Sequence, residues 1–129
     1  MRLTYIDAVE RNSLFHSELR SQLKAAGVAL IDSPEEATAI LAISIDETDQ
    51  RVLSVSARNV PTEYEVYYSI EYALMSGNNS LMAPQFLTLV RDYTYDETVV
   101  LGKLREEELM RDAIVKDLVR IVLKQLSAL

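Results

Sequence analysis

The chain has no cysteine, one histidine, and only three glycines and three prolines among its 129 residues. Without cysteine there can be no disulfide, no thiolate-bound metal and no cysteine nucleophile. Few glycines and prolines, combined with 49% hydrophobic residues, indicate a packed core rather than long disordered segments. A chain of this length is typical of one domain, so we expect residues 1–129 to form a single domain.

Positive charge is also scarce, and the formal net charge is -7. General binding to nucleic acid or to anionic membranes requires a broad basic surface, so the composition argues against both. An anionic ligand would have to be held by a local cluster of cations. No apolar run approaches the ~20 residues of a membrane span, and the N-terminal segment MRLTYIDAVERN lacks the uninterrupted apolar segment of a signal peptide. We therefore expect either a cytosolic protein or a mature form without its leader.

The clearest pattern in the sequence is the nearly strict alternation over residues 62–75, with Tyr67 and Ala73 among the polar positions. Six residues share one parity: Tyr64, Val66, Tyr68, Ile70, Tyr72 and Leu74. Side chains of a strand alternate between its two faces, so this segment is predicted to be a strand with one buried face. Residues 51–57 alternate in the same way, which predicts an antiparallel hairpin with Arg58, Asn59, Val60 and Pro61 at its tip. A cation at the tip of a rigid hairpin indicates a residue that is exposed for ligand binding.

The segment 39–57 contains two apolar runs around a polar middle. One parity is shared across that middle by Leu41, Ile43, Ile45, Leu53, Val55 and Ala57. We therefore predict one long bent strand that keeps this parity. A hairpin at 46–50 is the alternative, although no glycine is present to form its turn.

The remaining elements follow from caps, turns and periodicity. A short strand is predicted over 2–7, then a helix with Asn12 or Ser13 as its N-cap and Gly27 after its end. A short strand over 28–31 and one helical turn at 33–36 come next. After a turn at 76–80, a strand with a bulge is predicted over 84–95. The last element is a long helix over 104–126, whose apolar stripe comprises Met110, Ile114, Leu118, Ile121 and Val122.

The predicted order is strand, helix, strand, long strand, strand, strand, helix. Three long strands in an antiparallel meander, with two amphipathic helices on one face, give an α+β two-layer sandwich. In this topology the hairpin tip and the end of the last strand reach the same edge of the sheet. Arg58 and Lys103 should therefore lie at one end of the domain, beside a helix N-terminus, which favours anions.

Catalytic chemistry is not indicated. His16 is the only histidine, and the sequence shows no nucleophile–base pair, phosphate-binding loop or metal-ligand constellation. The carboxylates Glu106, Glu107 and Glu108 are best explained as a solvated first turn of a helix. We expect no enzymatic activity, no cofactor and no metal site.

Several weak motifs, taken together in order, resemble the LptE family of lipopolysaccharide-assembly lipoproteins. They are the hairpin turn followed by Thr62-Glu63-Tyr64, the segment Arg91-Asp92-Tyr93-Thr94-Tyr95-Asp96, and Val100-Leu101-Gly102-Lys103 with Glu106 and Glu107 behind it. The N-terminal half is similar more loosely, through a short strand and a helix ending in Lys24-Ala25-Ala26-Gly27-Val28. The likeness covers nearly the whole chain.

The resemblance implies a non-enzymatic role at the periplasmic face of the Gram-negative outer membrane. Proteins of this family form a plug inside the β-barrel protein LptD, bind lipopolysaccharide and help to deliver it to the outer leaflet. Lipids on an N-terminal cysteine anchor them in the inner leaflet. This chain has no cysteine, so we expect the signal peptide and the lipidated residue to have been removed from it, with Met1 supplied by cloning.

The resemblance also assigns binding residues. The basic residue of the hairpin turn corresponds to Arg58, and the lysine before the last helix corresponds to Lys103; both positions are implicated in lipopolysaccharide binding. Apolar neighbours, among them Val60 and Leu101 together with Val99 and Val100, are candidates for contact with acyl chains. The alternative from the residues alone is a small-anion-binding regulatory or interaction domain with the same fold.

Overall fold

The computed structural model describes residues 3–55, 57–58, 61–94 and 100–129, and the side chains of 61–62 and 100–104 are not considered. In chain order, the elements are β1 (Leu3–Ala8), α1 (Leu14–Ala25), β2 (Ala29–Leu30), the 3-10 turn η1 (Pro34–Glu36), β3 (Ala39–Val55), β4 (Pro61–Ser76), β5 (Asn79–Thr94) and α2 (Val100–Ser127). This order is the predicted one, and β3 is a single long strand rather than a hairpin.

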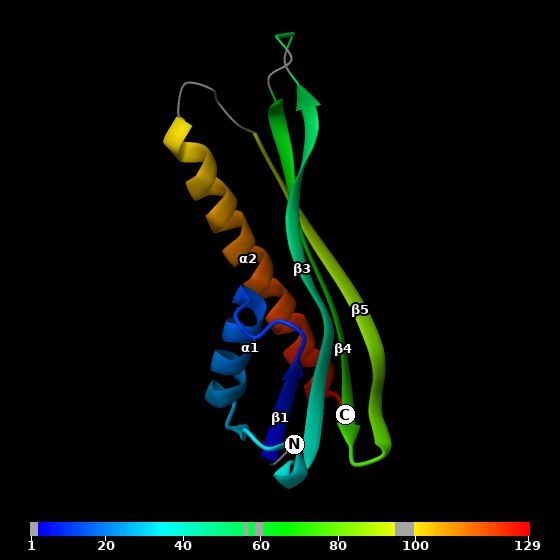
Figure 1. Cartoon of the computed structure of the whole chain (residues 1–129). Coiled ribbons are helices and arrows are strands. Elements are labelled where there is room, and N and C mark those ends of the chain that lie inside the picture. The colour runs from blue at the N-terminus through cyan, green and yellow to red at the C-terminus, as the bar shows by residue number, and fades with distance from the viewer. Residues whose placement is uncertain (1–2, 56, 59–60, 95–99) are drawn as a thin grey trace.

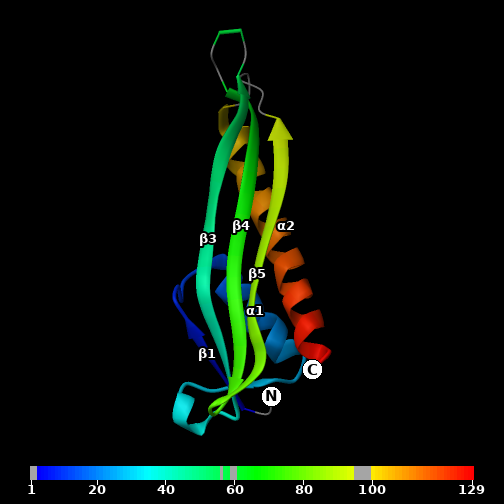
Figure 2. The same cartoon turned by 90° about the vertical axis from the view of Figure 1, so that its right-hand side faces the viewer.

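The five strands form one sheet in the order β2-β1-β3-β4-β5. The long strands β3, β4 and β5 are an antiparallel meander, and the short β1 pairs in parallel with both β2 and β3. Both helices lie on the same face of this sheet, as Figures 1 and 2 show. The predicted two-layer α+β sandwich is confirmed.

The core lies between this face and the two helices. The six alternating residues of β4 are each at most 5% exposed, as predicted. They pack against Phe15, Leu19 and Leu23 of α1 and against a broad stripe of α2. The buried residues of that stripe are Ile114, Val115, Leu118, Val119, Val122 and Leu126. The stripe is therefore wider than predicted, whereas Met110 and Ile121 are only partly buried.

Local signals account for the ends of several elements. The Ser13 hydroxyl caps α1 by accepting a hydrogen bond from the backbone N–H of His16 at 3.0 Å. Gly27, with φ 86°, follows the end of α1, and Gly77, with φ 60°, lies in the tight turn between β4 and β5. β5 begins at Asn79, five residues before the predicted strand over 84–95, and it contains a bulge near its start, where the register shifts between Met82 and Gln85.

One prediction about β3 was wrong. The register shifts between Ile43 and Ile45, because Ser44 is an extra residue opposite β4. Since side chains alternate with a period of two, one extra residue moves every later side chain to the other face. The predicted parity of Ile45 with the core residues Leu41 and Ile43 is therefore lost, and Ile45 pairs with Glu71 instead. The register shifts again between Val52 and Ser54, where Leu53 is the extra residue, and between Ser54 and Val55.

Tyr72 of β4 offers a test of this core. It is 1% exposed, and its hydroxyl has no hydrogen-bond partner within the described part of the chain. Burial raises the pKa of Tyr72 to about 12, compared with about 10 in an unfolded chain. The folded state thus holds this proton more tightly. The resulting stabilisation is complete below about pH 10 and is lost between about pH 10 and pH 12.

We expect Tyr72→Phe to remove this dependence without loss of stability at neutral pH, because no hydrogen bond is broken. Between about pH 10 and pH 12, the free energy of unfolding of the variant should fall less steeply, by up to about 1.4 kcal/mol per pH unit. Urea unfolding of both proteins at several pH values above 9 measures the difference. Parallel pH profiles of the free energy of unfolding for the two proteins would contradict the assignment of this pH dependence to Tyr72.

Candidate functional site

The two predicted cations are carried by elements that meet at one end of the molecule. Arg58 is exposed in the turn between β3 and β4, and Lys103 lies in the first turn of α2. Figure 1 shows the β3–β4 hairpin tip and the start of α2 at the same end. The side chains of Lys103 and Leu101 are outside the described set, and Val60 and Val99 lie outside the described residues altogether. The binding role of these four residues and of Arg58 stays a prediction.

The hairpin arm, defined here as residues 51–55 and 61–65, carries exposed apolar side chains that the sequence did not reveal. Val52, Leu53 and Val55 are 52%, 47% and 54% exposed. The alternation of Leu53 and Val55 predicted burial on one face, but Val52, which pairs with buried Tyr64, is exposed as well, so apolar side chains on both faces of this part of β3 reach solvent. Exposed apolar side chains therefore precede Arg58 in the strand that leads into its turn. A cation beside apolar surface is suited to an amphiphile with an anionic head.

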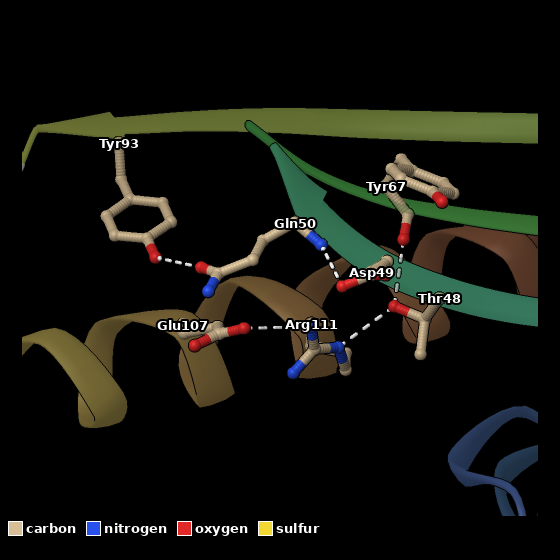
Figure 3. Close-up of polar contacts among 7 residues, drawn as sticks. All are labelled: Thr48, Asp49, Gln50, Tyr67, Tyr93, Glu107 and Arg111. Atoms are coloured by element: carbon tan, nitrogen blue, oxygen red, sulfur yellow. Dashed lines mark hydrogen bonds and ion pairs between the residues drawn. The ribbon is translucent and has the colours of Figure 1, made fainter. Parts of the chain in front are cut away.

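A polar seam connects the base of this arm with α2 (Figure 3). We define it by five residues: Thr48, Gln50, Tyr93, Glu107 and Arg111. The Arg111 side chain donates from Nε to Thr48 Oγ1 at 2.9 Å and forms an ion pair with Glu107 at 3.1 Å. The Tyr93 hydroxyl donates to Gln50 Oε1 at 3.0 Å. These contacts join β3, β5 and the N-terminal half of α2.

The same register shift turns the seam side chains of β3, Thr48 and Gln50, toward α2. After Ser44, the even-numbered residues Thr48 and Gln50 pair with inward-facing residues of β4, so their side chains face α2. Thr48 is exposed and also donates from its hydroxyl to the Tyr67 backbone carbonyl at 2.8 Å, whereas Gln50 is half-buried. The seam therefore holds α2 at Arg111 against β3, close to the base of the hairpin arm.

Tyr93 is held in its neutral form. Burial, followed by the nearby Glu107 carboxylate, raises the pKa of Tyr93 to about 12. Its ring stacks on Tyr64 with ring centres 5.3 Å apart and an interplanar angle of 15°. At neutral pH the hydroxyl is thus a donor in a fixed position, which suits a structural rather than an acid–base role.

His16 lies in a second polar group, at the start of α1. Here the Tyr68 hydroxyl donates to Asp46 at 2.5 Å, and the Ser13 hydroxyl donates to the same carboxylate. Desolvation, assisted by Arg20, lowers the pKa of His16, so its imidazole is neutral at neutral pH. Within the residues that the structure describes, no three potential ligands are grouped as a metal site would require. These contacts fasten α1 to β3.

The sheet face without helices carries one ion pair among the described residues, between Arg51 and Glu65. Arg51 also lies over the Tyr67 ring, 5.0 Å from its centre. The Ser44 hydroxyl donates to Glu71 at 2.8 Å.

Neither helix in the described ranges has a stretch long and apolar enough to cross a membrane.

Comparison with known proteins agrees with this architecture. The sequence model of the LptE family, described as lipopolysaccharide-assembly, matches residues 2–126. No curated protein sequence matches the chain significantly.

Three solved structures are similar in fold. Rare lipoprotein B of Shewanella oneidensis has a TM-score of 0.81 at 21% identity, with 98% of this chain and 94% of that chain covered. Lipoprotein B of Nitrosomonas europaea has a TM-score of 0.84 at 26% identity, with 98% and 83% covered. A minor lipoprotein of Acinetobacter baumannii has a TM-score of 0.79 at 20% identity, with 98% and 91% covered. Because the family match spans nearly the whole sequence, the chain belongs to the LptE family of lipopolysaccharide-assembly proteins.

Proposed function

We propose that this protein is a non-enzymatic, lipopolysaccharide-binding plug of an outer-membrane lipopolysaccharide translocon. Its partner in this proposal is a β-barrel protein of the LptD type. Membership of the LptE family supports a role in lipopolysaccharide assembly, and the geometry at the hairpin end supports the binding role. In the cell, a lipid on an N-terminal cysteine would anchor the protein to the inner leaflet of the outer membrane, on its periplasmic side.

The observation that carries the binding role is the combination of charge and apolar surface at one end. Arg58 lies in the turn between the two strands of the hairpin arm, whose Val52, Leu53 and Val55 are exposed, and Lys103 lies in the first turn of α2 at the same end. Lipid A presents phosphates next to acyl chains. Arginine and lysine form charge-assisted hydrogen bonds to phosphate oxygens, and exposed aliphatic side chains gain from burial against lipid. The arrangement therefore matches both parts of this ligand.

The mechanism follows from competition between cations. Lipopolysaccharide molecules are bridged to each other by divalent cations. Arg58 and Lys103 would replace these ions at the phosphates of one molecule and so separate it from its neighbours. The hairpin arm, with Val60, Val99, Val100 and Leu101 as further candidates, would shield part of the acyl chains during transfer.

Two measurements test this function with the unaltered chain. The first is co-sedimentation with vesicles that contain lipopolysaccharide, compared with zwitterionic phospholipid vesicles and with free inorganic phosphate as a competitor. We expect binding only to the lipopolysaccharide vesicles. Equal affinity for free phosphate would instead support a small-anion-binding domain. The second is co-purification with an affinity-tagged LptD-type barrel, and failure to co-purify would refute the plug role.

A further inference from the structure

The first half of α2 has little apolar attachment to the rest of the domain. Among its described residues from 105 to 113, none is fully buried, and only Glu107, Met110 and Arg111 are partly buried. Full burial of side chains begins at Ile114. Figure 1 shows this half of α2 slanting away from the hairpin arm toward its start. With so few buried apolar side chains, packing alone leaves the direction of this half of the helix weakly determined.

A polar contact supplies a constraint where apolar packing is sparse. Arg111 donates from Nε to the Thr48 hydroxyl at 2.9 Å, and that hydroxyl donates to the backbone carbonyl of Tyr67 at 2.8 Å. The next described polar contact between α2 and the sheet, from Arg91 to Asp117 at 2.6 Å, lies six residues further from the start of the helix. The Arg111–Thr48 contact is therefore well placed to set the direction of the first half of α2.

The chemistry of this contact suits positioning better than stabilisation. The side chains of Arg111 and Glu107, which form an ion pair at 3.1 Å, are only 19% and 13% exposed. Charges withdrawn from water in this way add little net stability, because the cost of their desolvation offsets their attraction. Hydrogen bonds from a planar guanidinium are directional, however, so they are satisfied at one placement of the helix, whereas apolar side chains tolerate sliding.

The placement of Arg111 controls where the start of the helix lies. Lys103 precedes Arg111 by eight residues, which is about 12 Å along the axis at ~1.5 Å per residue. A tilt of α2 by about 10° at Arg111 would displace the first turn by about 2 Å. Thr48 lies in β3, the strand that leads into the turn of Arg58. The Arg111–Thr48 contact thus joins the two elements that carry the candidate cations.

A ligand with several phosphates on one rigid core requires cations at a matching spacing, and lipid A is such a ligand. Binding groups that are not held close to the productive geometry have to be ordered when the ligand binds, and this ordering lowers the affinity. A phosphate contact by Arg111 itself is disfavoured, because its guanidinium already binds Thr48 and Glu107 and is mostly buried.

We propose that Arg111 is a positioning residue for lipopolysaccharide binding. Through Thr48, it holds the start of α2 at the distance from the hairpin arm at which Lys103 and Arg58 engage the phosphates of one molecule. The inference rests on the proposed binding function and adds to it two residues that do not touch the ligand. Loss of the Arg111–Thr48 contact therefore lowers the affinity only while Lys103 is present.

The test is a double-mutant cycle between Thr48 and Lys103. Thr48→Val removes the hydroxyl that accepts the Arg111 hydrogen bond and leaves every charge in place, and Lys103→Ala is made with and without it. Affinity is measured by co-sedimentation with vesicles that contain lipopolysaccharide. Thr48→Ser keeps the hydroxyl and serves as the conservative variant. Thr88→Val is the matched control, because the Thr88 hydroxyl also has a partner in the sheet, Ser69 at 2.8 Å, but on the face without helices.

We expect Thr48→Val to weaken binding about five- to ten-fold in the chain that contains Lys103, and by less than about two-fold in the Lys103→Ala chain. Thr48→Ser and Thr88→Val should bind like the unaltered chain. No loss from Thr48→Val, an equal loss in both backgrounds, or an equal loss from Thr88→Val would overturn the positioning role while leaving the binding function intact. If the unaltered chain does not bind lipopolysaccharide, the binding function is refuted, and this inference with it.

The spacing itself is measurable, because the chain has no native cysteine that would compete with introduced labels. Spin labels at Ala57→Cys, in the hairpin turn, and at Glu106→Cys, in α2, report the distance between the two elements from exposed positions. We expect Thr48→Val to broaden the distribution of this distance, and Thr88→Val to leave it unchanged. An unchanged distribution in the Thr48→Val protein would overturn the positioning role even if its affinity falls.

Discussion

Replacing Arg58 and Lys103 together by aspartate is expected to weaken binding to lipopolysaccharide vesicles by at least about 100-fold. A charge-assisted hydrogen bond contributes about 1.5–3 kcal/mol, so the loss of two such bonds amounts to about 3 kcal/mol or more. Each 1.4 kcal/mol corresponds to a factor of ten in affinity. The new carboxylates also repel the phosphates, which adds to the loss. Co-sedimentation over a range of vesicle concentrations measures the change.

This double variant should fold normally. Arg58 is exposed in a turn, and aspartate in the first turn of α2 is favoured by the helix dipole at the position of Lys103. Arg20→Asp with Lys24→Asp is a control with the same change in net charge, placed on α1 away from the hairpin end. Circular dichroism should be the same for all three proteins. Unchanged affinity of the Arg58 and Lys103 variant would remove these residues from the binding site.

The parts of the fold that depend on local patterns could be predicted from the sequence. The alternation from Tyr64 to Leu74 identified the buried face of β4, because a single strand with no extra residue keeps a period of two. Ser13 and Gly27 marked the ends of α1 through capping and a positive φ. The meeting of the hairpin tip with the start of α2 followed from counting antiparallel strands, without any knowledge of side-chain contacts.

The parts that depend on register could not be predicted. No feature of the residues around Ser44 predicts the extra residue, yet it decides that Thr48 and Gln50 face α2, and two further shifts follow between Val52 and Val55. The Arg111–Thr48 contact joins residues 63 positions apart and exists only because of that shift. For this reason the sequence revealed the candidate cations but missed both the polar seam between β3 and α2 and the apolar side chains of the hairpin arm.

Phe15 is the largest of the α1 side chains that attach this helix to the sheet, beside the buried Leu19 and Leu23. Phe15 of α1 is fully buried, and its ring lies 6.3 Å from the Tyr68 ring at an interplanar angle of 49°. Its backbone N–H also donates to the Tyr68 hydroxyl at 3.3 Å, a bond that a change of side chain does not remove. Phe15→Ala would leave a cavity between α1 and the sheet. We expect it to lower the free energy of unfolding by about 3–5 kcal/mol.

The neighbouring residue provides the control for this prediction. Leu14 is in the same helical turn but is 48% exposed, so Leu14→Ala removes little buried surface and should cost less than about 1 kcal/mol. Urea unfolding followed by circular dichroism gives both values. If the two substitutions cost the same, α1 is not held by the core around Tyr68.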